Sequence, residues 1–71
     1  MSEGMITRRG QIWDIGGIGW RVLGDHPHAD CVALKCVKSD WRIWVPMGAF
    51  RDGSWSHGGI EFRVRLIEDA P

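Results

Sequence analysis

The chain has 71 residues, with nine Lys and Arg against nine Asp and Glu, so its net charge is zero. This length predicts one domain, residues 1–71, with a thin core. The charge balance argues against a protein that binds nucleic acid mainly by neutralising phosphates, because such domains carry a clear basic excess. The polar residues 1–10 and the lack of a long apolar stretch predict a cytoplasmic protein without membrane contact.

Five tryptophans are unusual in so short a chain. Each can bury roughly 150–250 Å² of surface. We expect at least two of them in the core, where they compensate for the small size of the domain. The others are candidates for contact with a partner.

The first third of the chain contains two predicted strands. Residues 1–9 carry no strand pattern and are expected to form a loosely ordered N-terminal segment. Residues 11–15 and 20–23 are predicted strands, and the glycines of segment 16–19 predict a turn or bulge between them. Residues 25–30 are expected to form an exposed loop.

Residues 31–37 are the third predicted strand. Alternation puts Val32, Leu34 and Cys36 on the core face. Cys31 and Cys36 then lie on opposite faces of one strand, which excludes a disulfide between them. We expect reduced thiols, with Cys36 buried in the core.

Residues 41–45 are the fourth predicted strand, joined to the third by the polar turn 38–40. Alternation puts Ile43 and Val45 on the core face, together with Trp41. Arg42 and Trp44 then face outward.

The last third of the chain begins at Pro46, which ends the fourth strand. Residues 46–50 are expected to form a short helical turn, and the Gly- and Ser-rich segment 51–59 a loop. Residues 60–67 give the clearest strand signal, because apolar and charged residues alternate with period two. The apolar set is Ile60, Phe62, Val64 and Leu66.

About five short strands, separated by turn residues, predict an all-β fold. Their order, with a helical turn before the last strand, is typical of a small SH3-like barrel of antiparallel strands. The alternative is a curved antiparallel sheet that is closed only by pairing with a second copy. A homodimer is a hypothesis in either case, because thin barrels often expose a strand edge.

A metal site is one hypothesis for the histidines of the 25–30 loop. His26, His28, Cys31 and Cys36 supply the imidazole and thiolate ligands that zinc prefers. Their spacing is not a usual zinc pattern. We therefore expect no cofactor and no metal, with His26, His28 and Cys31 as weak candidate ligands.

Catalytic motifs give no better signal. Ser54, Ser56 and His57 are neighbours in one predicted loop, whereas a triad needs groups that converge from separate elements. The Gly-Gly-x-Gly sequence at residues 16–19 is not followed by a helix, as a phosphate-binding loop would be. We expect a protein that is not an enzyme.

Exposed Trp and Arg residues are the feature that most favours a function. These residue types are enriched at binding hot spots, and they also suit single-stranded nucleic acid through stacking and phosphate contact. The histidine loop is a further recognition candidate, because loops carry function on rigid scaffolds. The predicted partner-binding residues are Arg42, Trp44, Arg51, Trp55, Arg63, Arg65, His26 and His28.

The function predicted from these observations is a non-enzymatic module that binds a protein partner or complex and acts by surface occupation. Short single-domain chains without catalytic or cofactor motifs are typical of accessory proteins from phages and mobile elements, including inhibitors of host complexes such as anti-CRISPR proteins. The alternatives are a nucleic-acid-binding barrel that uses exposed Trp and Arg, and a metal-binding structural protein. Acidic residues interleaved with the arginines would favour a protein partner, and arginines segregated on one face would favour nucleic acid.

Overall fold

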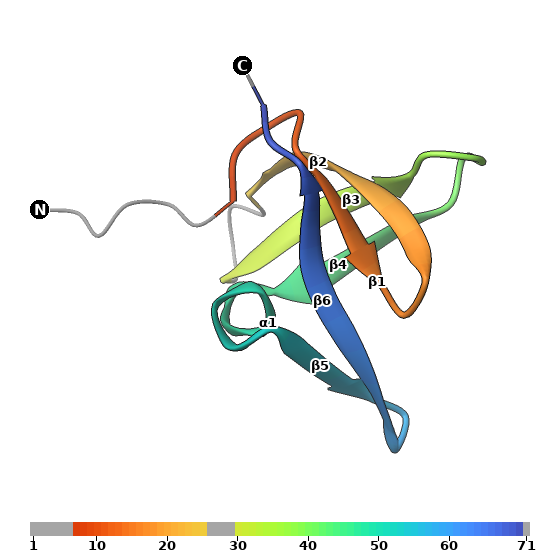
Figure 1. The fold of residues 1–71 in the computed structure, drawn as a ribbon, viewed down its shortest axis with the longest axis vertical. Coiled ribbons are helices and arrows are strands. Elements are labelled where there is room, and N and C mark those ends of the chain that lie inside the picture. Colours follow the sequence, from red (N-terminus) through yellow and green to blue (C-terminus); the bar gives the residue numbers. More distant parts are fainter. Residues whose placement is uncertain (1–6, 26–29, 71) are drawn as a thin grey trace, which may run out of the picture.

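The computed structural model describes residues 7–25 and 30–70. These residues form one small, nearly closed antiparallel barrel of six strands with a short helix (Figure 1). The elements are β1 (Ile12–Ile15), β2 (Ile18–Asp25), β3 (Cys31–Cys36), β4 (Arg42–Pro46), α1 (Met47–Asp52), β5 (Ser54–His57) and β6 (Ile60–Glu68). The predicted all-β small barrel is confirmed.

The strands follow the order β4-β3-β2-β1-β6-β5. Strands β1 to β4 form a meander in which each strand pairs with the next, and α1 then leads to the β5–β6 hairpin. Strand β6 returns to pair with β1, so the end of the chain closes the barrel against its beginning (Figure 1). This is the connectivity of the predicted SH3-like barrel, extended by one strand.

Two tight hairpin turns depend on glycine pairs. Gly16 and Gly17 connect β1 to β2, and Gly58 and Gly59 connect β5 to β6. All four have positive φ, from +62° to +93°. A two-residue turn with positive φ at both positions matches the twist of the strands that it joins, and only glycine adopts it without strain.

The core lies inside the barrel and is built from alternate residues of the strands. Trp13 and Phe50 pack edge to face with their ring centroids 4.9 Å apart, so α1 contributes to the core from the end of β4. Both Trp13 and Trp20 are buried, which confirms the expectation of at least two core tryptophans. The buried apolar residues are Trp13, Ile15, Trp20, Val22, Val32, Leu34, Val45, Ala49, Phe50 and Val64.

Segment 51–59, predicted as a loop, contains the end of α1 and the whole of β5. Its sequence, Ser-Trp-Ser-His, is not rich in strand-forming residues. It becomes a strand because it pairs along its whole length with β6, which at nine residues is the longest strand among the described residues. The prediction of a loop here was wrong.

Two predictions of burial were also wrong. Trp41 was expected in the core, but it lies just before β4 and its side chain is exposed. Cys36, at the end of β3, is only half-buried. Both residues have the alternation phase of the core, but they flank the turn that joins β3 to β4, at the end of the hairpin.

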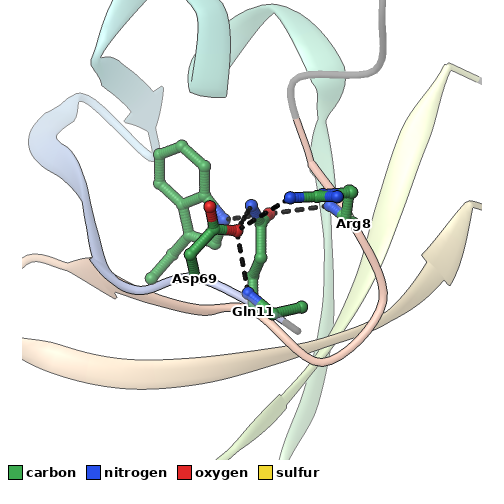
Figure 2. A network of polar contacts seen from close by, with 5 residues as sticks. Arg8, Gln11 and Asp69 are labelled. Atoms are coloured by element: carbon green, nitrogen blue, oxygen red, sulfur yellow. Dashed lines mark hydrogen bonds and ion pairs between the residues drawn. The ribbon is translucent and has the colours of Figure 1, made fainter.

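A polar network joins the two ends of the described chain (Figure 2). The buried Gln11 accepts hydrogen bonds at Oε1 from the Trp13 indole N–H, at 3.1 Å, and from the Arg8 backbone N–H, at 2.7 Å. Its Nε2 donates to Asp69 Oδ1 at 2.7 Å. The same carboxylate oxygen accepts from the Ala70 backbone N–H and lies 3.5 Å from the Arg8 guanidinium. These bonds lower the pKa of Asp69, the Gln11 amide having the largest effect.

Residues 1–6 of the N-terminal segment that was expected to be loose lie outside the described residues. Of the remainder, Thr7 is buried and its hydroxyl lies 3.7 Å from Met47 Sδ, whereas Arg8 and Arg9 are exposed. Within residues 7–25 and 30–70, no helix has the length and apolar character needed to cross a membrane.

Candidate binding surface

The hairpin of β3 and β4 presents two large aromatic side chains to solvent. Trp41 is 73% exposed and Trp44 is 54% exposed. Trp44 faces outward because alternation along β4 turns Ile43 and the fully buried Val45 toward the core. The outward positions predicted for Arg42 and Trp44 are therefore confirmed.

The turn before β4 holds the backbone of Trp41 in place. The Cys36 N–H donates to the Trp41 carbonyl oxygen at 2.8 Å, and the Trp41 N–H donates to Ser39 Oγ at 3.2 Å. The Ser39 hydroxyl also lowers the pKa of the Cys36 thiol, with further help from the Lys38 backbone. A shallow hollow of about 430 Å³ adjoins this turn, lined by Ser39, Asp40, Trp41 and Arg42. The indole of Trp41 is therefore exposed on a defined backbone.

A row of three basic residues crosses the outer face beside Trp44. In the sheet register, Arg21 on β2 is opposite Lys35 on β3, and Lys35 is opposite Arg42 on β4. All three have the outward phase of their strands, since their neighbours Val22, Leu34 and Ile43 form the next row on the inner side. Asp40 forms an ion pair with the row, its Oδ1 being 3.6 Å from Lys35 Nζ. On the other side of Arg21, Ile12 of β1 separates it from Glu68 of β6 in the register. We call Arg21, Lys35 and Arg42 the basic row.

Sequence patterns singled out Arg42 but neither Arg21 nor Lys35. These two residues come from different hairpins, and only the pairing of β2 with β3 brings them together. The predicted turn 38–40 did not supply this register, because a hairpin centred on residue 39 would pair Lys35 with Ile43. The observed hairpin is centred between residues 38 and 39 and pairs Lys35 with Arg42.

The other predicted arginines lie elsewhere. Arg63 and Arg65 are exposed on β6, which is separated from β4 by three strands in the sheet order. Arg65 is directly opposite Asp14 of β1, and Arg63 alternates with Glu61 on the same face of β6. Acidic residues are thus interleaved with this second pair. The predicted Trp/Arg surface divides into two separate regions.

Trp55 lies on β5 and packs partly against the core. Its ring centroid is 5.8 Å from that of Phe62 and 4.9 Å from that of the nearly parallel His57 imidazole. A second shallow hollow of about 530 Å³ lies on this hairpin, lined by Gly53, Ser54, Glu61, Phe62 and Arg63. Arg51 is exposed in the last turn of α1. Trp55 is therefore a half-buried residue rather than an outward anchor.

The serines and histidine of β5 do not converge. Alternation along the strand places Ser54 and Ser56 on one face and His57 on the other, beside Trp55. This arrangement lacks the hydrogen bond from nucleophile to base that serine catalysis needs.

Of the weak metal candidates, His26 and His28 lie outside the described residues. Cys31 is half-buried on the outward face of β3, opposite Pro46, and Cys36 is opposite Trp20. Both cysteines are free thiols on opposite faces, as predicted. Across residues 7–25 and 30–70, no group of three or more His, Cys, Asp or Glu residues is arranged to hold a metal ion.

Comparison of the chain with protein-family models, curated proteins and solved structures finds no match.

Proposed function

We propose that this chain is a small, non-enzymatic binding module that recognises a protein partner and acts by occupying its surface. The observation that carries the proposal is the pair of exposed tryptophans, Trp41 and Trp44, on one hairpin beside Arg42. Such a module would suit a cytoplasmic inhibitor of a host complex, encoded by a phage or mobile element.

The area of the two indoles is enough to anchor a partner. From the exposed fractions of 73% and 54%, the solvent-exposed area of the Trp41 and Trp44 side chains sums to roughly 200–300 Å². At about 25 cal/mol per Å², complete burial would be worth about 5–8 kcal/mol before the entropy of association is subtracted. Tryptophan and arginine at the centre of an interface are the residues that most often carry its affinity.

The distribution of charge supports a protein partner over nucleic acid. Asp14 is opposite Arg65, Glu61 is next to Arg63 in the outward row of β6, and Asp40 is beside Lys35. Because acids accompany the arginines and the chain is neutral overall, a polyphosphate would meet repulsion as well as attraction.

The test is affinity capture from lysate with the immobilised wild-type protein, with and without nuclease. We expect a specific protein complex that survives nuclease and is lost with the variant Trp41→Ala/Trp44→Ala. The matched control is Ile60→Ala/Leu66→Ala, which removes two other exposed apolar side chains, on β6. Loss of the complex with nuclease, or equal loss with both variants, would refute a protein-binding face at this hairpin.

A further inference from the structure

The basic row lies on the same outer face as Trp44, and it limits the chemistry of the partner. We infer that the partner presents an acidic protein segment, whose carboxylates pair with Arg21, Lys35 and Arg42 while its apolar residues cover Trp44. This inference rests on the proposed function and adds the kind of surface that is recognised.

The first argument is the arrangement of charge in the free protein. Arg21, Lys35 and Arg42 are directly opposite one another on three adjacent strands. Like charges in this position destabilise a sheet. Asp40 offsets one of the three, and its own side chain is fully exposed at the rim. Three cations with one ion-paired carboxylate leave a net positive charge on the row, which carboxylates of a partner would offset.

The second argument is the spacing of the row. Adjacent strands are about 4.8 Å apart, so the three cations span about 10 Å across the sheet. Carboxylates on one face of an extended segment repeat every 6.6–6.8 Å or so, and two or three of them cover that distance. The flexible stems of Lys and Arg absorb the small mismatch in spacing.

The third argument concerns the residues on either side of the row. Trp44 is two positions beyond Arg42 on β4 and opposite Ala33, so an aromatic ring borders the charges. Asp40 borders them at the other end, 3.6 Å from Lys35. A continuous phosphate backbone would approach this carboxylate, whereas a protein segment can place an amide, a hydroxyl or a lysine there. The mixture of cations, aromatic ring and one acid therefore favours a protein segment.

The experiment measures fluorescence anisotropy of three labelled probes. The first is a peptide of about 12 residues that alternates Glu with Gly and has one central Phe, long enough to cross the barrel. The second has Lys in place of Glu, and the third is an oligothymidylate of similar length. We expect the acidic peptide to bind more tightly than both others. Its affinity should fall at least about tenfold between roughly 0.05 and 0.5 M salt, as screening removes the ion pairs.

Two double variants of equal charge locate the site. We expect Arg21→Gln/Arg42→Gln to weaken binding of the acidic peptide about tenfold or more, and Arg51→Gln/Arg63→Gln to leave it within about twofold. Equal losses in the two variants would show attraction by total charge and overturn the inference. Tighter binding of oligothymidylate would overturn it in favour of single-stranded nucleic acid, and lack of binding by the acidic peptide would overturn it as well.

The captured partner separates this inference from the proposed function. A complex that is lost with Trp41→Ala/Trp44→Ala but retained by Arg21→Gln/Arg42→Gln would support the proposed protein-binding module. The same outcome would overturn the inference that its partner is acidic. Loss of the complex with both variants supports the inference.

Discussion

Replacing Gln11 with methionine tests whether the network at the chain ends stabilises the barrel. Methionine matches the length of glutamine but neither accepts nor donates comparable hydrogen bonds. The Trp13 indole N–H, which donates to Gln11 Oε1 inside the core, would lose its partner. The Arg8 backbone N–H would also lose its acceptor. The Asp69 side chain is more than half exposed, so water replaces much of what it loses.

The expected magnitude follows from the buried donor. An unsatisfied buried N–H costs about 1–3 kcal/mol, so we expect Gln11→Met to lower the free energy of unfolding by about 2 kcal/mol. In a domain of this size that corresponds to a fall in Tm of about 8–16 °C. Thermal and urea unfolding, followed by circular dichroism, measure it. A variant within about 0.5 kcal/mol of wild type would refute a stabilising role for the network.

Gln11→Glu is the informative comparison, because it retains the acceptor for Trp13 and Arg8 but replaces the amide that donates to Asp69. Two carboxylates in hydrogen-bond contact raise the pKa of one of them. A raised folded pKa means that stability is present at low pH and is lost as the pH rises through that pKa. We therefore expect this variant to be more stable near pH 5 than near pH 8. An unchanged Tm over this range would contradict the geometry of Figure 2.

Three further predictions follow from single sites. The lowered pKa of Asp69 contributes stability above its unfolded value of about 4, which is lost as the pH falls through the folded pKa. The Tm of Asp69→Asn should therefore fall less than the Tm of the wild type as the pH is lowered into the acid range. Gly16→Ala should destabilise by about 2–3 kcal/mol in urea unfolding, because φ is +62° and the new Cβ would lie 2.7 Å from Phe62 Cδ1. Ser39→Ala should slow alkylation of Cys36 a few-fold near pH 7, because the hydroxyl that lowers its pKa is removed.

Each of these predictions has an internal control. Gly17 also has positive φ, but a Cβ there would meet nothing within 4 Å, so Gly17→Ala should cost only the backbone strain, about 1–2 kcal/mol. Equal effects at the two glycines would rule out the contact with Phe62. Cys31 is the control for alkylation: its rate should be the same in wild type and Ser39→Ala. For Asp69→Asn, an acid profile identical to that of wild type would show that other carboxylates dominate.

Most of the fold could be predicted from residue patterns within short segments of the sequence. The alternation of apolar residues predicted several core positions correctly in three strands. The buried residues at these alternate positions are Val32 and Leu34 in β3, Val45 in β4 and Val64 in β6. The glycine pair at 16–17 is a hairpin signal for a similarly local reason, since its backbone conformation disfavours most other residues. Period-two alternation and turn residues are properties of a few neighbouring positions, so they can be recognised without knowledge of the rest of the chain.

The position of strand ends and the composition of the outer face depended on tertiary pairing. Alternation predicted Trp41 to be buried, but it cannot show that the barrel stops short of this residue. Strand β5 exists because β6 is long enough to pair with it. The basic row needs the registers of three strands, and the Gln11–Asp69 bond joins residues 58 positions apart. Such contacts are set by how the sheet closes, which is a property of the whole chain and of no single segment.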